Sequence, residues 1–264
     1  MKLLHGTDRA MFEKDALGIW NDRPIRSMLL AMPVVFVIGV PIVFLAMIYM
    51  VPTESPSGTW RLVEFLPDYV REWDIRQIMF YLLVNIVCPM FFLLNALLTA
   101  SLTSAILFGG EKGQATAETL MLTPLSARRI FYAKVRCSLL FAGISSVVSL
   151  IALVIVVAVG SILLGLFFFG PLWIVVLLLL TPAVSLLGTL SMAILSRRAK
   201  DTVSCAQLSG YAALPVILLF VLQLTGLYQL DFPVLLVFGA LALAADGFLW
   251  MICLRCFSPE RLSL

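Results

Sequence analysis

A run of sixty residues without Asp, Glu, Lys, Arg or His, residues 137–196, constrains this chain more than any other feature. A single helix of that length would extend about 90 Å, whereas the hydrocarbon core of a bilayer is about 30 Å thick. We therefore expect the run to cross a membrane twice. Gly165, Gly170 and Pro171 mark the place where the chain is expected to turn between the two crossings.

The rest of the chain predicts four further spans. Charged residues make up only 12% of the sequence, whereas a soluble domain carries about 25%. The apolar runs are longer than barrel strands and lack a period-two alternation, which leaves helices as the spanning element. The predicted class is an all-α integral membrane protein with six transmembrane helices. These cover residues 29–51, 78–108, 130–159, 171–196, 206–227 and 233–254.

The distribution of Lys and Arg predicts how the spans are oriented. Fifteen of the 18 basic residues lie in the N-terminal segment, the second-to-third connection, the fourth-to-fifth connection and the C-terminal tail. The other three, Arg61, Arg71 and Arg76, fall on the opposite side. By the positive-inside rule, both termini are expected in the cytoplasm. We expect a multi-pass protein of the cell inner or plasma membrane.

The N-terminal segment, residues 1–27, combines charges with apolar side chains at near-helical spacing. The apolar positions are Met11, Phe12, Ala16 and Ile19. This pattern predicts a cytoplasmic amphipathic helix on the inner membrane surface, with a disordered tail as the alternative.

The six-span domain is expected to occupy residues 28–264. Its only sizeable external segment is residues 52–77, which begins with the loop-forming sequence PTESPSG. The remainder of this segment, with four aromatic residues among charges, is expected to lie on the outer leaflet or to cap the external mouth.

The chain contains no set of residues suited to catalysis or to nucleotide binding. It has neither a G-x-x-x-x-G-K-[ST] phosphate loop nor an H-E-x-x-H helix, and its one histidine, His5, excludes a Ser/His/Asp triad. The five cysteines predict no disulfide framework, and the pair Cys253 and Cys256 lacks a second pair of metal ligands. We expect this chain not to be an enzyme and to bind no metal or cofactor itself.

Charged and helix-capping residues interrupt the apolar chain at residues 108–129, FGGEKGQATAETLMLTPLSARR. Gly109 and Gly110 are expected to end the second span. Thr116 can then cap a new helix, which Pro124 stops about seven residues later.

This short helix is about 10 Å long and is marginal on its own in water. Glu118 falls in its first turn, where it faces the positive end of the helix dipole. Leu120, Met121 and Leu122 need to be covered. On the residues alone, either the membrane interface or a groove on a partner protein covers them.

The same stretch resembles the coupling-helix region of the ABC type-2 (type V) exporter permeases. That family has a Glu followed by a charged residue, a Thr and a Glu before a leucine pair, then Thr-Pro-Leu-Ser and a Lys eight residues later. The matching residues are Glu111–Lys112, Thr116, Glu118, Leu120 with Leu122, Thr123–Pro124–Leu125–Ser126, and Lys134. Ala115 and Ala117 depart from the Gly and the Leu that are usual in the family, although alanine favours a helix.

The resemblance implies the transmembrane permease subunit of an ATP-driven ABC exporter, which moves an unidentified substrate out of the cytoplasm or inner leaflet. Two permease subunits, as a homodimer or heterodimer, would pair in the lipid bilayer. Each would carry a separate ATPase subunit that binds ATP and Mg, and no nucleic acid is expected. The residues that would contact the ATPase are Glu111, Thr116, Glu118, Leu120, Leu122, Pro124 and Leu125. Lys134, Arg197 and Arg198 would support this region, one of them pairing with Glu111.

A few polar residues lie inside the predicted spans. Asp246 is the only acid well inside one, so it is a candidate for contact with cargo, an ion or a proton, with a structural contact or snorkelling as alternatives. Asn85 and Asn95 are weaker candidates for the transport path, because amides also join helices by hydrogen bonds. The small residues of the third span predict close helix packing. They are Ala142, Gly143, Ser145, Ser146 and Ser149.

Two other classes of protein stay open. One is an ion- or proton-coupled secondary transporter with Asp246 as the carrier, which should contain internal repeats or paired broken helices. The other is a non-transporting membrane protein, such as an assembly or immunity factor. The coupling-helix resemblance favours the exporter over both.

Overall fold

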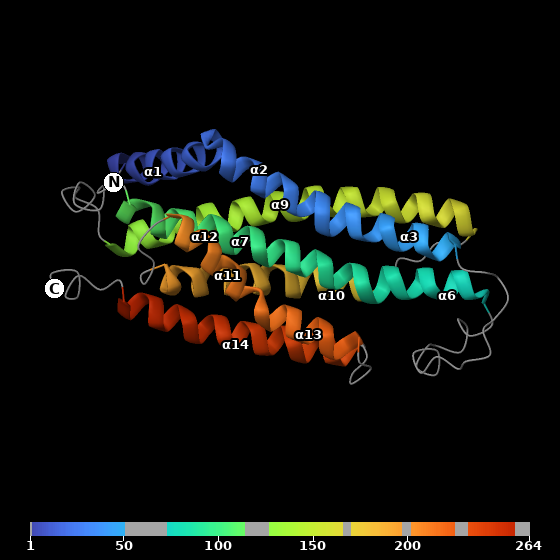
Figure 1. Ribbon diagram of the computed structural model, residues 1–264. Helices are drawn as coiled ribbons and strands as arrows, with labels where there is room; N and C mark the ends of the chain where they lie inside the picture. Colours follow the sequence, from blue (N-terminus) through green and yellow to red (C-terminus); the bar gives the residue numbers. More distant parts are fainter. Residues whose placement is uncertain are drawn as a thin grey trace.

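The computed structural model describes residues 2–50, 73–113, 127–165, 170–196, 202–224 and 232–256. Most of its helices run along one shared direction and form an elongated bundle (Figure 1). The start of α1 and the end of α14 lie at the same end of that bundle. The bounds are α1 (Lys2–Asn21), α2 (Arg23–Pro33), η1 (Val34–Gly39), α3 (Val40–Met50), α6 (Ile75–Leu82), η2 (Leu83–Val87), α7 (Cys88–Gly113), α9 (Ala127–Leu164), α10 (Leu172–Val175), η3 (Val176–Leu180), α11 (Thr181–Leu195), α12 (Thr202–Ala212), α13 (Leu214–Leu224) and α14 (Phe232–Cys256).

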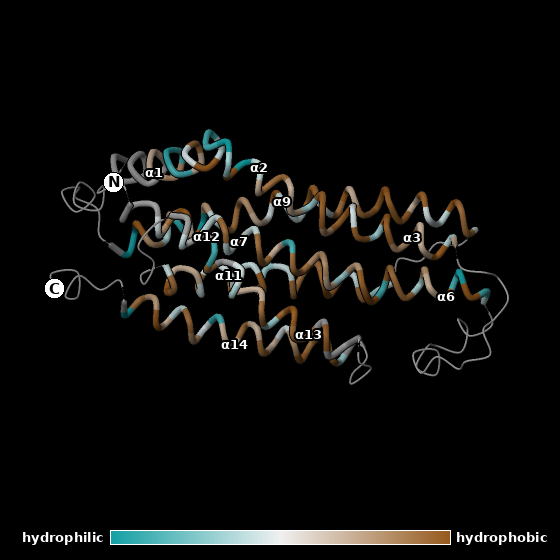
Figure 2. The backbone as a smooth tube through the Cα atoms, viewed as in Figure 1, coloured by the Kyte–Doolittle hydropathy of each residue, from teal (hydrophilic) through white to brown (hydrophobic). Residues whose placement is uncertain are grey.

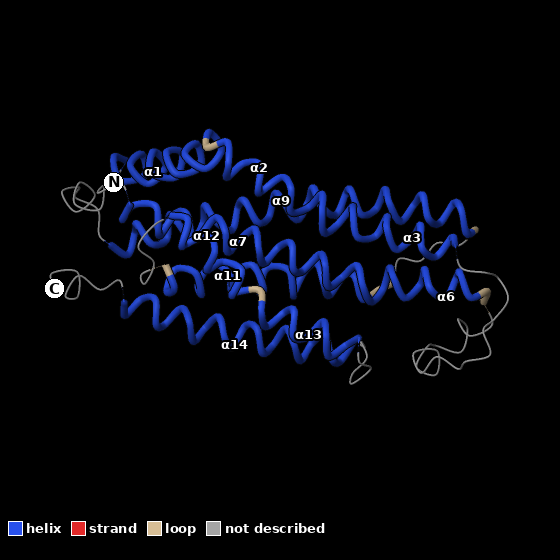
Figure 3. The backbone as a smooth tube through the Cα atoms, viewed as in Figure 1, coloured by secondary structure: helices blue, strands red, loops and turns tan. Residues whose placement is uncertain are grey.

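Five helical stretches are long and apolar enough to cross a membrane, and each overlaps a predicted span. They are Arg23–Met50, Ile75–Gly109, Arg128–Leu164, Leu172–Leu195 and Pro233–Arg255. Hydrophobic residues follow their length in Figure 2, and many of the exposed side chains on α9, α13 and α14 are large and apolar. The described part of the chain contains helices and short loops and no strand (Figure 3). The predicted all-α class is confirmed, and the chain is compatible with a multi-pass membrane protein. The sixth span and the side on which the termini lie stay predictions.

Three of the spanning stretches contain a π-helical segment, and each segment ends two residues before a proline. η1 ends at Gly39 before Pro41, η2 ends at Val87 before Pro89, and η3 ends at Leu180 before Pro182. Proline has no N–H to donate and its ring collides with the carbonyl four residues earlier. The wider π turn accommodates both effects, so these helices continue through their prolines.

The predicted fifth span, residues 206–227, consists of two helices instead of one. α12 ends at Ala212 and α13 begins at Leu214, and the Ala213 N–H donates to the Gly210 carbonyl at 3.1 Å. Pro215 cannot donate to the carbonyl of Tyr211, so the α-helical bond that would join the two helices is missing. The apolar helical stretch found here among the described residues, Gly210–Leu219, is shorter than a full span.

The turn predicted within the uncharged run is confirmed at its first glycine. Gly165 follows the end of α9 with φ of +75°, and its N–H donates to the Ser161 carbonyl at 2.8 Å. This left-handed conformation favours glycine because it has no Cβ. Pro171 then precedes α10.

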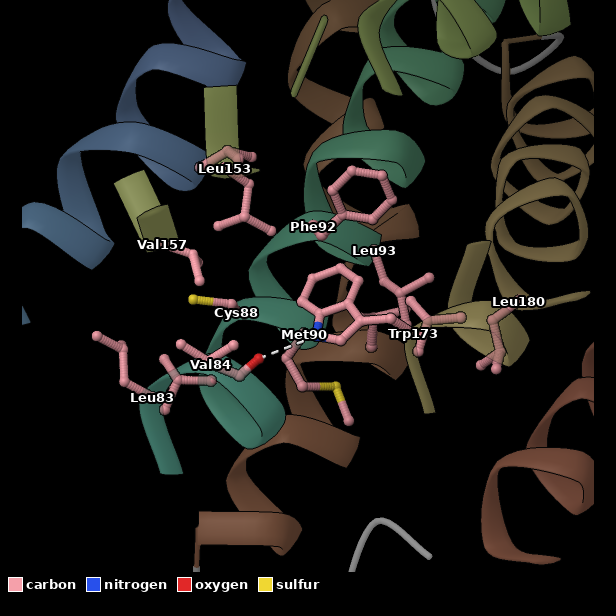
Figure 4. Packing of buried hydrophobic residues seen from close by; sticks show 14 of the residues in the cluster. Leu83, Val84, Cys88, Met90, Phe92, Leu93, Leu153, Val157, Trp173 and Leu180 are labelled. Carbon is pink, nitrogen blue, oxygen red and sulfur yellow. Dashed lines mark hydrogen bonds between the residues drawn. The ribbon is translucent and has the colours of Figure 1, made fainter. Parts of the chain in front are cut away.

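The core is centred on α7, which packs against α9, α11 and α12. Figure 4 shows the ring of Phe92 edge-on to Trp173, with centroids 5.9 Å apart, and the Trp173 indole N–H donating to the Val84 carbonyl at 3.2 Å. α11 approaches α7 at Gly188, where a Cβ would lie 2.9 Å from the carbonyl oxygen of Leu97. Small residues at such crossings are typical of helix contacts in membranes.

The N-terminal helix α1 lies against the end of the bundle at which α7 ends and α9 begins (Figure 1). Ile19 is buried, and Phe12 and Ala16 belong to the same apolar cluster as residues of α7 and α9. The predicted helix is therefore present, but its apolar side packs on protein instead of on the membrane surface. Leu17 and Trp20 are exposed and remain available to the interface.

Candidate functional site

Most of the predicted ATPase contact lies outside the described residues. This holds for Thr116, Glu118, Leu120, Leu122, Pro124 and Leu125, and also for Arg197 and Arg198. Glu111 lies in α7, but its side chain is outside the described part. The structure does describe α7 and α9, the helices on either side of that segment.

α7 continues beyond the point at which the sequence predicted its end. The helix passes through Gly109 and Gly110 and ends at Gly113, so the predicted stop at the glycine pair is wrong. A glycine inside a helix costs only about 1 kcal/mol relative to alanine. The buried contacts of Leu107 and Phe108 immediately before the pair are sufficient to hold the helix together.

Lys134 joins the end of α7 to the start of α9. Its side chain is only 2% exposed, and its Nζ donates to the backbone carbonyl of Leu107. The ammonium lies 5.3 Å from the centre of the Phe108 ring, within cation–π range. The predicted supporting role of Lys134 stays a prediction, and the contact that the structure shows for this residue is with the backbone of α7.

An aromatic cluster reinforces the same junction. Phe131 of α9 is fully buried, and its ring centre lies 5.8 Å from that of Phe108 on α7. It also lies 5.6 Å from the ring of Trp250 on α14, which in turn packs on Tyr132 at 5.6 Å. Sequence reasoning did not single out these rings, because aromatic residues are frequent in apolar spans and only the helix arrangement brings these four together.

Farther from the junction, Asn95 of α7 bridges to α9. Its Nδ2 donates to Ser149 Oγ at 2.9 Å and to Ser145 Oγ at 3.3 Å, and Thr99 and Ser145 share a hydrogen bond of 3.3 Å. Asn95 and Ser149 have no exposed surface. The amide donors are used for helix contact, which supports the alternative given for Asn95. The close packing predicted for the small residues of this span is confirmed at Ala142, Ser146 and Ser149, whereas Gly143 is exposed.

A second polar group joins α7, α9 and α11. Ser138 Oγ lies 2.9 Å from Thr103 Oγ1 and 3.1 Å from Thr189 Oγ1, and it donates to the Ala100 carbonyl at 2.9 Å. Ser104 donates to the Thr189 carbonyl at 2.7 Å. All these hydroxyls are fully buried. Each finds an acceptor, as buried polar groups in a bilayer require.

Asn85 lies near the opposite end of α7, in η2. Its Nδ2 donates to the Tyr81 carbonyl at 3.2 Å. Gly170 passes so close that a Cβ there would lie 2.7 Å from Asn85 Oδ1. Asn85 therefore lies beside the chain where α10 begins, a position that fits a structural role.

Asp246 lies apart from both asparagines, on the α14 side of the contact with α11. Its side chain is 2% exposed. Neither carboxyl oxygen has a hydrogen-bond partner among the residues that the structure describes. Asp246 therefore has no hydrogen bond to Asn85 or Asn95 in the described part of the chain, and a transport path through these residues stays a prediction.

The remaining candidates offer little chemistry. Cys253 is buried, with its Sγ 3.8 Å from the Leu190 carbonyl. Within the described ranges, no three His, Cys, Asp or Glu residues are grouped so that they could hold a metal ion.

No protein-family model, curated protein or solved structure matches this chain. Two features of the chain itself bear on its function. One is the α7–α9 junction, which flanks the segment that resembles the coupling-helix region. The other is the buried carboxyl of Asp246.

Proposed function

We propose that this chain is the membrane-spanning permease subunit of an ATP-driven ABC exporter that moves a substrate out of the cytoplasm or the inner leaflet. The proposal starts from the resemblance of residues 108–129 to the coupling-helix region of the type-2 exporter permeases. The observation that supports it best is the junction between Lys134 and the carbonyl of Leu107. It binds together the two helices that enter and leave this segment.

Such a junction suits the transmission of force. A partner that pushes on residues 114–126 loads the end of α7 and the start of α9 at once. The Phe108–Phe131 contact and the buried Lys134 hold these two ends together, so they move as one unit. Because α7 packs against α9, α11 and α12, displacement of its end reaches most of the bundle.

The partner in this proposal is a separate ATPase subunit, which binds ATP and Mg. Glu118 pairs with a basic residue of its groove, while Leu120 and Leu122 fill the groove floor. Burial of one leucine contributes about 1.5–3 kcal/mol. Glu111, Thr116, Pro124 and Leu125 complete the contact. Two permease subunits in the inner or plasma membrane form the working unit, as a homodimer or a heterodimer.

The test is to purify the chain from its host in mild detergent and to identify stoichiometric partners by mass spectrometry. We expect an ATPase subunit to co-purify with the wild-type chain and to be lost from Glu118→Arg, with membrane insertion unchanged. Glu72→Arg, in the segment predicted to be external, is the matched control and should keep the ATPase.

A wild-type chain that purifies alone, or with an unrelated protein, would overturn the exporter proposal. An ion- or proton-coupled secondary transporter would then become the leading candidate. The observation that favours that second function is the buried carboxyl of Asp246, which has no hydrogen-bond partner among the described residues.

A further inference from the structure

We infer that Asp246 is a proton-binding site, which holds a neutral carboxylic acid in the packed contact between α14 and α11. Proton release from this site requires the two helices to separate. The site does not depend on an ATPase partner.

Asp246 lies on the side of α14 that faces the rest of the bundle. One side of this helix carries a regular four-three spacing of inward-facing residues. They are Leu235, Gly239, Ala242, Asp246, Leu249 and Cys253. Leu235, Gly239, Asp246 and Cys253 are all buried. Asp246 therefore occupies a position that in a helix pair is normally apolar.

This side of α14 faces η3 and α11. Gly239 is so close to α11 and η3 that a Cβ there would lie 2.5 Å from Leu179 Cδ2. Cys253 lies 3.8 Å from the Leu190 carbonyl. Asp246 is seven residues from each, and a seven-residue step stays on nearly the same side of a helix. Its register thus falls between Leu179 of η3 and Leu190 of α11.

Asp246 has no charged neighbour on the segment that it faces. Residues 172–196, which contain α10, η3 and α11, include no titratable side chain at all. On α14 itself, Arg255 is nine residues away, or about 13 Å along the axis. On α9, the ring of Tyr132 packs on Trp250 of α14, and Lys134 donates to the carbonyl of Leu107. Nothing described neutralises a carboxylate at residue 246.

The surroundings of Asp246 also indicate which ligand this site can take. A metal cation would require several further ligands, and no group of three His, Cys, Asp or Glu residues that could hold one is found in the described ranges. An amine of a cargo molecule would require open space, whereas both carboxyl oxygens have almost no accessible surface. A proton needs neither. An unpaired acid in an apolar surrounding takes up a proton instead of remaining charged.

A mechanical consequence follows from this state. The ionised form needs water or a cation, and no described residue at the packed α14–α11 contact pairs with the carboxyl oxygens. Protonation thus favours the packed arrangement, and loss of the proton favours an arrangement in which α14 has moved away from α11. Any movement of α14 during transport would then carry a pH dependence.

The test is infrared difference spectroscopy of the full chain in lipid nanodiscs. At neutral pH we expect the carbonyl stretch of a protonated carboxyl group, and we expect Asp246→Asn to abolish it. Asp22→Asn is the control, because this residue is exposed at the start of α2 and asparagine caps helices equally well. It should leave the band unchanged. Absence of the band from the wild-type chain at neutral pH would overturn the proposal.

Thermal unfolding across a pH series provides a second measurement. Asparagine resembles the neutral acid, so Asp246→Asn should fold and melt close to wild type at low pH. As the pH rises, the melting temperature of the wild-type chain should fall relative to that of the variant. A variant that is destabilised equally at every pH would show instead an ionised carboxylate paired with a cation, and would also overturn the proposal.

Discussion

Lys134, one of the largest fully buried side chains, donates from its Nζ to the main-chain carbonyl of Leu107 on the neighbouring helix. A lysine contact to backbone does not depend on which side chain occupies position 107. The contact fixes the axial position of α7 against α9 at the point where the chain leaves for residues 114–126. Lys134, which was predicted only as support in the polar region, thus links two spans.

Replacement of Lys134 by methionine should loosen this junction. Methionine keeps most of the volume and leaves no unpaired charge, so the change isolates the hydrogen bond and the cation–π contact. Hydrogen bonds to charged groups contribute about 1.5–3 kcal/mol. We expect a lower melting temperature in detergent, measured by the reaction of a thiol dye with the buried Cys88, Cys137 and Cys253.

The matched control for that change is Arg136→Met, two residues further along α9, where the side chain is exposed. It removes the same charge from the same helix and should leave the melting temperature near that of wild type. Equal losses in the two variants would mean that the charge, and not the contact with Leu107, stabilises the chain.

Two buried serines should respond in opposite ways to removal of the hydroxyl. Ser138 makes three hydrogen bonds, whereas Ser101 Oγ has no partner within the described residues, and both side chains are fully buried. Ser138→Ala should cost about 0.6–1.7 kcal/mol, the range for hydrogen bonds between membrane helices. Ser101→Ala should be neutral or stabilising, because it removes an unsatisfied polar group. The test is to compare the melting temperatures of both variants with that of wild type. A lower melting temperature for Ser101→Ala would show that the Ser101 hydroxyl has a partner.

The positions of the spans could be predicted from the sequence because a bilayer leaves the backbone few choices. The uncharged run and the turn at Gly165 are examples. Four of the prolines inside predicted spans could not be interpreted from the sequence in the same way. Pro41, Pro89 and Pro182 are absorbed by π turns, whereas Pro215 separates α12 from α13. Which outcome occurs depends on the neighbouring helices, and these are not visible in the sequence.

The candidate site shows the same division. Asp246 stood out because a charged residue inside an apolar span needs a reason, and Lys134 stood out because it matches the coupling-helix pattern. The cluster of Phe108, Phe131, Tyr132 and Trp250 did not stand out, since its rings come from three helices far apart in the chain. Gly109 and Gly110 misled the prediction of the end of α7, because packing outweighs a small helix propensity.

Asn95→Leu should separate a structural role from a transport role for this residue. Leucine fills a similar volume but leaves the Ser145 and Ser149 hydroxyls without their amide donor. We expect a loss of about 0.6–1.7 kcal/mol in stability, with transport retained by the folded fraction. The measurement is transport per folded molecule in proteoliposomes, once a substrate is in hand. Transport abolished at full stability would place Asn95 on the path instead.

Gly188→Ala should be among the most damaging small substitutions in the chain. Its Cβ would lie 2.7 Å from Ser101 Oγ, 2.8 Å from Leu97 Cδ1 and 2.9 Å from the Leu97 carbonyl oxygen. A side chain can move away, but the carbonyl belongs to the backbone of α7, so α11 itself must shift. Overpacking of this kind costs about 1–3 kcal/mol.

Gly143→Ala provides the control within a spanning helix. No atom lies within 4 Å of its added Cβ, and alanine favours the helix by up to about 1 kcal/mol. The melting temperature should therefore fall for Gly188→Ala and stay level or rise for Gly143→Ala. If both variants melt like wild type, α7 and α11 are not in the close contact described here. If Gly143→Ala alone is destabilised, the exposed side of α9 meets a partner, such as a second copy of the chain, and not lipid alone.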